Sequence, residues 1–218
     1  MVQMDKVMMV YENSGTVAAN GIDLVIEDGE FVFLVGPSGS GKTTIIKLLT
    51  GEVRASDGEI FVNDFNMRTI KPRKMPQLRR TLGVIFQDFR LIDDKTVYEN
   101  VAFAMRVVGA SKKEIDERVP YVLELVGLEG REKRLPQELS GGEQQRVAIA
   151  RAIAHKPKIV FADEPTAELD TNTGLQVLKI FKDLTAMEGV TIVMTTHDTG
   201  LMELGDQVYQ LEDGELIE

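Results

Sequence analysis

The feature that most constrains this chain is the run Gly-Pro-Ser-Gly-Ser-Gly-Lys-Thr at residues 36–43. It follows the apolar residues 31–35 and precedes a helical pattern that includes Ile45, Leu48 and Leu49. Glycines at these spacings let backbone N–H groups turn inward around an anion, and the start of a helix adds positive potential there. Because the run fits G-x-x-x-x-G-K-[ST], it predicts a phosphate-binding loop between a buried strand and a helix.

The chemistry of the loop assigns a role to each residue. We expect Lys42 to reach the β- and γ-phosphates of a nucleotide and the Thr43 hydroxyl to ligate Mg²⁺. A loop that is rich in Gly and Ser only by chance would not need the strand before it and the helix after it. The other residues expected to line the nucleotide have small side chains or free backbone amides: Gly36, Pro37, Ser38, Gly39, Ser40, Gly41 and Thr44.

Two acidic residues follow a second apolar run, residues 159–162. A buried strand that ends in a carboxylate carries negative charge to the edge of the sheet, where a nucleotide-bound Mg²⁺ would lie. Asp163 is therefore the predicted Mg²⁺ partner, through water, and Glu164 can accept a proton from an attacking water. An acidic turn after a strand is common, so the prediction depends on its combination with the phosphate-binding loop.

Residues 139–146 read Leu-Ser-Gly-Gly-Glu-Gln-Gln-Arg and form a second helix start with small residues and free amides. Such a start suits an anion, although Ser-Gly-Gly alone would be an ordinary helix cap. The full run resembles the signature sequence of the ATP-binding cassette (ABC) ATPases, and the likeness spans nearly the whole chain. The resemblance implies that Ser140, Gly141 and Gly142 contact nucleotide.

Further positions match motifs of the ABC family in the family's order. Gln87 matches the Q-loop residue, which implies a place beside Mg²⁺ and the attacking water. His197 matches the switch histidine, which implies contact with the γ-phosphate. Asp170 matches the D-loop, and Tyr11 stands where an aromatic residue stacks on adenine. The D-loop departs from the family at Ala167-Glu168, where Gly-Asn is usual.

The resemblance implies ATP and Mg²⁺ as cofactors and the reaction ATP + H2O to ADP + phosphate, with Glu164, His197 and Gln87 as catalytic residues. It also implies a homodimer. Ser140 and Gly142 of one copy would face the γ-phosphate that is held by Lys42 of the other copy. Two ATP molecules would then be buried between the copies, and hydrolysis would separate them.

The predicted fold is α/β, with strands and helices alternating along the chain. The resemblance implies the P-loop NTPase fold of ABC ATPases: a mostly parallel core sheet flanked by helices, an N-terminal antiparallel β-subdomain and an inserted α-helical subdomain. We expect one ABC ATPase domain over residues 1–218, with the helical subdomain at about 88–138. Asp28-Gly29 predicts a hairpin turn. Strands are expected at 7–11, 22–26, 31–35, 59–62, 82–86, 159–162 and 190–195, with a short pair of strands near the C-terminus. Helices are expected at 96–127, 142–155 and 171–187. The first of these helical stretches should break near Gly109 and begin again with Ser111 as its N-cap.

Within the family, residues 78–88, 96–101 and 138–146 resemble the FtsE branch of bacterial cell-division ATPases. This resemblance implies an integral membrane partner of the FtsX type, contacting the region of Phe89 and Leu91, and control of peptidoglycan hydrolases. It places the chain peripherally on the cytoplasmic face of a bacterial cell membrane. The C-terminus resembles equally the ATPases of lipoprotein release and macrolide export. An ATP-binding scaffold with little hydrolysis is the alternative from another class.

The composition of the chain argues against several kinds of partner, metal site and membrane segment. A net charge of −10 argues against wide contact with nucleic acid. The absence of cysteine excludes disulfides and thiolate metal sites. No apolar run reaches the ~18 residues that cross a bilayer, and no signal-peptide pattern begins the chain, which favours the cytosol. A chromosome-organising ATPase would need a long heptad insert, and a ribosome-binding ABC factor would carry a second cassette. The sequence shows neither feature, which argues against both classes.

The exception to the acidic composition is residues 68–80, which contain six basic residues and no acidic one. The stretch is either a solvated face or a patch that faces anionic lipid head groups.

Overall fold

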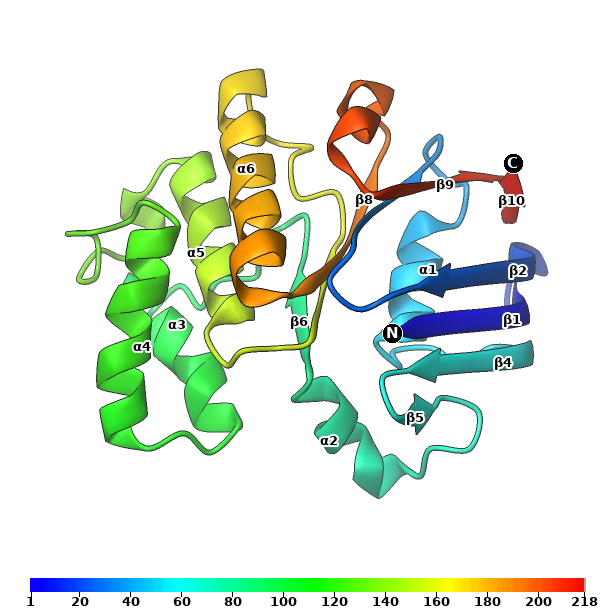
Figure 1. Ribbon diagram of the computed structural model, residues 1–218, viewed down its shortest axis with the longest axis horizontal. Coiled ribbons are helices and arrows are strands. Elements are labelled where there is room, and N and C mark those ends of the chain that lie inside the picture. The colour runs from blue at the N-terminus through cyan, green and yellow to red at the C-terminus, as the bar shows by residue number, and fades with distance from the viewer. Residues whose placement is uncertain (218) are drawn as a thin grey trace.

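The computed structural model describes residues 1–217, without the side chains of residues 199 and 201. Its larger sheet has the strand order β10-β9-β3-β8-β7-β6 (Figure 1). Neighbouring strands are parallel except for β10, which pairs antiparallel with β9. The mostly parallel sheet is therefore confirmed. The strands are β3 (Phe31–Val35), β6 (Leu82–Ile85), β7 (Ile159–Ala162), β8 (Thr191–Thr196), β9 (Gln207–Glu212) and β10 (Glu215–Ile217).

Helices cover both faces of this sheet. Every residue of β3, β7 and β8 is buried, which is why these strands are continuous rather than alternating apolar runs. Phe31 and Phe33 pack into the same core cluster as α5 (Gly141–Ile153) and α6 (Thr171–Glu188). Val32 and Leu34 point the other way, into the cluster that contains α1 (Lys42–Leu49). The sheet thus separates two cores.

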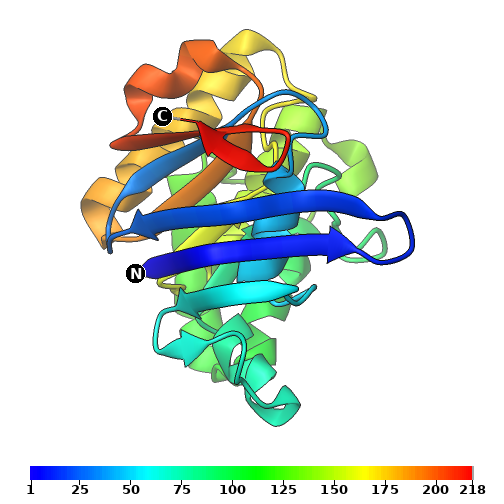
Figure 2. The same cartoon turned by 90° about the vertical axis from the view of Figure 1, so that its right-hand side faces the viewer.

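The smaller sheet is antiparallel, with the order β2-β1-β4-β5 (Figure 2). Its strands are β1 (Val2–Tyr11), β2 (Thr16–Ile26), β4 (Asp57–Val62) and β5 (Phe65–Asn66). The predicted hairpin at Asp28-Gly29 is wrong, because β2 pairs with β1 whereas β3 pairs with β8 and β9. A strand with one exposed face suits the smaller sheet, and a strand buried on both faces suits the larger one. Residues 27–30 therefore carry the chain from one sheet to the other.

Helices α3 (Val97–Val107) and α4 (Lys112–Leu125) lie beyond α5, away from the smaller sheet (Figure 1). The predicted break near Gly109 and the N-cap at Ser111 are confirmed, and Thr96 and Ser111 each form a capping box with a glutamate. The sequence predicted no helix at η1 (Pro72–Lys74), α2 (Met75–Arg79), η2 (Pro136–Glu138) or η3 (Thr199–Leu204). No helix of residues 1–217 is both long and apolar enough to cross a membrane.

Candidate nucleotide-binding site

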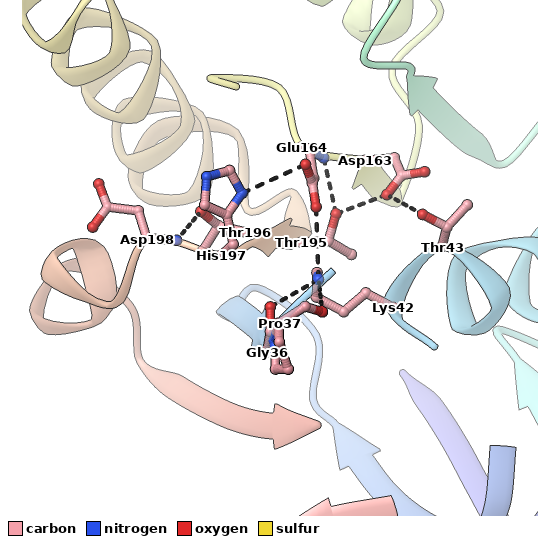
Figure 3. A network of polar contacts seen from close by, with 10 residues as sticks. All are labelled: Gly36, Pro37, Lys42, Thr43, Asp163, Glu164, Thr195, Thr196, His197 and Asp198. Carbon is pink, nitrogen blue, oxygen red and sulfur yellow. Dashed lines mark hydrogen bonds and ion pairs between the residues drawn. The ribbon is translucent and has the colours of Figure 1, made fainter. Parts of the chain in front are cut away.

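The predicted phosphate-binding loop joins the end of β3 to the start of α1 (Figure 3). Gly41 has φ 107°, and a Cβ atom there would lie 2.3 Å from the carbonyl oxygen of Ala18, so only glycine fits. Lys42 is 4% exposed, and its Nζ donates to the carbonyl oxygens of Gly36 and Pro37, each at 2.9 Å. The loop therefore folds around its own lysine and fixes the position of the ammonium group.

The two predicted carboxylates reach this loop from the end of β7. The Thr43 hydroxyl donates to Asp163 Oδ1 at 3.2 Å, and Lys42 Nζ lies 3.6 Å from Glu164 Oε1. The carboxyl ends of the parallel strands β3 and β7 lie at the same edge of the sheet, with β8 between them. This topology brings residues far apart in the sequence into one cluster of hydroxyl, ammonium and carboxylate groups (Figure 3).

Thr195 joins the two carboxylates to β8, and sequence reasoning missed it. Its buried hydroxyl donates to Asp163 Oδ1 at 2.8 Å and accepts from the backbone N–H of Glu164 at 2.8 Å. Glu164 has φ 45°, a left-handed conformation that costs a residue with a side chain about 1 kcal/mol or more. Thr195 thus stabilises a strained turn. The signal was a threonine inside a buried apolar strand, because a buried hydroxyl needs a hydrogen-bond partner.

We expect Thr195→Val to lower kcat for ATP hydrolysis about tenfold while changing KM for ATP little, because misplaced catalytic groups slow the reaction. It should also lower the free energy of unfolding by about 1–3 kcal/mol, since the Glu164 N–H loses its buried acceptor. Thr195→Ser keeps the hydroxyl and should keep kcat. Steady-state ATPase assays and thermal melts check both effects. Equal kcat in the valine and serine variants would limit the Thr195 hydroxyl to a role in stability.

His197 lies beside Glu164, just past the end of β8. Its Nδ1 is 3.6 Å from Glu164 Oε2, and 61% of its side chain is exposed. The backbone N–H of Asp198 donates to the Thr196 hydroxyl at 3.0 Å, which orders the turn that carries the imidazole. The Glu164 carboxylate therefore faces Lys42 with one oxygen and His197 with the other (Figure 3).

Two other predicted residues lie at the margin of this cluster. Tyr11 ends β1, and its hydroxyl lies 3.3 Å from the Thr44 hydroxyl in the first turn of α1. Gln87 is exposed just after β6, and the structure of residues 1–217 shows no hydrogen bond from its side chain to Thr43 or Asp163. Tyr11 thus contacts the helix that begins at the loop, whereas Gln87 stands apart from the Mg²⁺ ligands predicted with it.

Arg151 holds the loop after Gln87, and sequence reasoning missed this residue as well. Its guanidinium donates to the carbonyl oxygens of Phe89, at 2.7 Å, and Arg90. Both residues have left-handed backbone, with φ 55° and 47°. Burial lowers the pKa of Arg151. The available signal for Arg151 was a positively charged residue among buried apolar positions of a helix, because a charge in such surroundings needs a partner. The helix that begins with the signature sequence thereby positions the Q-loop.

The signature sequence and the D-loop begin two helices that pack together. Ser140 caps α5, and its N–H and hydroxyl hold Glu143 and lower the pKa of that carboxyl. Asp170 caps α6, and the Thr173 hydroxyl and N–H lower its pKa. A Cβ atom on Gly142 would lie 2.5 Å from Thr173 Cγ2, so a larger residue there would displace the Thr173 side chain. Between residues 1 and 217, no hydrogen bond or ion pair joins Ser140, Gly141 or Gly142 to the phosphate-binding loop.

Comparison with known proteins agrees with this geometry. The model of the ABC transporter family matches residues 19–167, which include the phosphate-binding loop, the signature sequence and the acidic pair. The chain is 43% identical to the cell division ATP-binding protein FtsE of Streptococcus pneumoniae, covering 99% of this chain and 94% of that one. It is 44% identical to FtsE of Bacillus subtilis, covering 100% and 95%.

A solved structure extends the likeness to three dimensions. The ATP-binding cassette MJ0796, solved as a dimer in a post-hydrolysis state with ADP and Pi, has a TM-score of 0.91 and 34% identity to this chain. The match covers 100% of this chain and 97% of that one. The chain belongs to the ABC transporter family and is an ATP-hydrolysing cassette similar to the FtsE cell-division ATP-binding proteins.

Proposed function

We propose that this cassette is the ATPase subunit of a bacterial cell-division complex. An integral membrane partner of the FtsX type would pass its ATP cycle to peptidoglycan hydrolases outside the cell. The observation that carries the proposal is 43–44% identity to FtsE proteins along 99–100% of the chain. The cassette would then be peripheral, on the cytoplasmic face of the cell membrane.

In this proposal the phosphate-binding loop and Lys42 bind the phosphates of ATP, and Tyr11 stacks on the adenine. The Thr43 hydroxyl and the Asp163 carboxylate, 3.2 Å apart, are oxygen donors of the kind that Mg²⁺ takes, with phosphate and water as its remaining ligands. Gln87 would complete this set from the Q-loop. Bound Mg²⁺ would neutralise charge on the β- and γ-phosphates.

Hydrolysis needs an oriented water and a group that accepts its proton. Glu164 fills the second role, since its carboxylate is anchored between Lys42 and His197. The water oxygen bonds to the γ-phosphorus as the bond to the β-phosphate oxygen breaks, which yields ADP and phosphate. Lys42 offers positive charge, and Lys42 and His197 both offer hydrogen bonds to the oxygens of the transferring group.

A second copy of the chain supplies the signature sequence to each nucleotide. The helix start at Ser140–Gly142 is suited to an anion but makes no hydrogen bond or ion pair to its own phosphate-binding loop within residues 1–217. A homodimer with the two copies facing each other would place this helix start against the γ-phosphate held by the other copy. The similar cassette MJ0796, which was solved as a dimer with ADP and Pi, supports a dimer of this chain.

The membrane partner would dock in a groove beside the Q-loop, between α2, β6 and α3. Phe86, Ile92, Phe103 and Val107 contribute apolar lining, and the last two side chains are 48% and 55% exposed. This groove differs from the expected contact at Phe89 and Leu91, because neither residue lines it. Leu91 packs instead against the core cluster that contains α5 and α6. Because Arg90 and Ile92 belong to the groove wall, docking there would reach the loop that carries Gln87.

We expect Phe103→Glu to lose the partner when the tagged protein is isolated from solubilised native membranes, because a carboxylate would be buried in an apolar contact. Basal ATPase activity should stay within about twofold, since the groove that Phe103 lines contains no residue of the phosphate-binding loop. Met187→Glu, at a 69% exposed position on α6, is the matched control and should retain the partner. Mass spectrometry identifies what is captured.

The captured proteins also decide between branches of the family. One membrane protein together with peptidoglycan hydrolases supports the division complex. A permease accompanied by lipoproteins or an efflux adaptor would move the chain to the lipoprotein-release or macrolide-export branch. A partner retained by Phe103→Glu as well as by the control would contradict docking in the groove.

A further inference from the structure

We propose that a basic strip on η1 and α2 binds the head groups of anionic lipids. The strip consists of Lys71, Arg73, Lys74, Arg79 and Arg80, and in the described structure all are exposed. The proposal rests on the proposed function in one respect, because docking of a membrane partner is what would bring this face to a bilayer. It adds a second contact with the membrane, made by the cassette itself.

Within residues 1–217, no carboxylate neutralises the charges of the strip. Among the ion pairs of residues 1–217, none includes a strip residue. Neighbouring Arg68 differs, since Asp57 and Glu59 lie 3.3 and 3.9 Å from it, and it is excluded from the strip. Lys74 donates a hydrogen bond to Gln77 Oε1 and Arg79 donates one to the carbonyl oxygen of Gly51, and neither acceptor is charged. Five positive charges in the described structure thus lack an acidic partner, on a chain whose net charge is −10.

The local fold directs these cations outward. Leu78 is fully buried, and Met75 packs against the core cluster that contains α1, so these two side chains attach α2 to the protein. Pro72 and Pro76 stand in the first turns of η1 and α2, where a missing N–H costs no hydrogen bond. Both views place α2 at the edge of the molecule (Figures 1 and 2). A flat charged surface can therefore approach the strip.

The strip is continuous with the surface proposed for the membrane partner. Arg79, Arg80 and Pro76 line the same groove as Phe103 and Val107. An apolar groove that holds a segment of a membrane protein would therefore have cations along one border. A partner segment that enters the groove from the bilayer would bring lipid head groups towards that border, where Lys71, Arg73 and Lys74 continue the positive charge.

Lipid fits this strip better than nucleic acid does. Clusters of four to eight Lys or Arg residues are attracted to the negative surface potential of a membrane. Residues 68–80 contain no aromatic side chain on which a base could stack. The acidic remainder of the chain would repel a long polyanion that left the strip. Lipid head groups can contact the strip alone, without approaching the acidic remainder of the chain.

Co-sedimentation of the full chain with vesicles tests the proposal without any membrane protein. The chain should sediment with vesicles of phosphatidylglycerol and phosphatidylcholine, but not with vesicles of phosphatidylcholine alone, and salt should weaken the binding. The triple variant Lys71→Glu, Arg73→Glu, Lys74→Glu should bind at least about tenfold more weakly. A matched variant, Lys112→Glu, Lys133→Glu, Lys182→Glu, has the same net charge at exposed positions elsewhere and should bind like the parent.

Each other outcome would overturn the lipid contact. Equal binding by the parent and the strip variant, or equal binding to vesicles without anionic lipid, would show that the strip does not select lipid head groups. Failure of the parent to bind, with partner capture lost in the strip variant only, would assign the strip to an acidic segment of the partner protein. The vesicles contain no partner protein, so co-sedimentation does not depend on which branch of the family the chain belongs to. In the same way, failure to bind vesicles would not change which proteins the parent chain captures from native membranes.

Discussion

Glu164→Gln is expected to lower the rate of ATP hydrolysis by about 10²–10⁴-fold and to leave ATP binding close to that of the parent. The amide matches the carboxylate in shape but cannot accept the proton of the attacking water. Lys42 keeps its hydrogen bonds to the carbonyl oxygens of Gly36 and Pro37, so the phosphate-binding loop should stay intact. With ATP bound and not consumed, the dimer should accumulate.

Three measurements check this expectation: phosphate release, nucleotide binding by calorimetry, and size-exclusion chromatography with and without ATP and Mg²⁺. Glu168→Gln is the matched control, because Glu168 is an exposed carboxylate in the unusual D-loop, four residues along. It should hydrolyse ATP at nearly the parental rate. Parental turnover in Glu164→Gln would remove Glu164 from its role as the base. A parent chain that itself binds ATP and barely hydrolyses it would favour the scaffold alternative.

The sequence predicted those parts of the site that depend on local chemistry. Glycine at position 41 is needed for one backbone turn, and two short polar residues, Thr43 and Asp163, stand at the start of α1 and just after β7. Alternation of strands and helices then predicted the parallel sheet. From this order alone the residues after β3 and β7 had to meet at one edge, as they do.

The parts that were missed depend on packing between distant segments. Thr195 lies in a buried strand and Arg151 lies on α5. Their roles become visible only when Asp163, Glu164 and Phe89 are placed against them. The failed hairpin has the same cause. A turn pattern at residues 28–29 says nothing about which sheet receives the next strand, and hydrogen bonding with β8 and β9 decides it.

Lys42→Met is expected to weaken ATP binding by at least about 100-fold, because charge-assisted hydrogen bonds to phosphate are among the strongest in proteins. Methionine preserves the buried stem, so the thermal melt should shift much less than after substitution by alanine. The matched control is Lys47→Met, which removes a positive charge from the same helix, α1, outside the loop.

The Lys42 experiment also tests the charge balance around Glu164. The Lys42 ammonium lies 3.6 Å from Glu164 Oε1 and is more buried than the His197 imidazole, which faces the other carboxylate oxygen. Loss of that ammonium should therefore abolish turnover even at ATP concentrations that saturate the weakened site, whereas Lys47→Met should retain both affinity and rate. Isothermal titration calorimetry with ATP and phosphate release at saturating ATP separate the two effects. Parental ATP affinity in Lys42→Met would contradict the assignment of residues 36–43 as the phosphate-binding loop, on which the other site assignments depend.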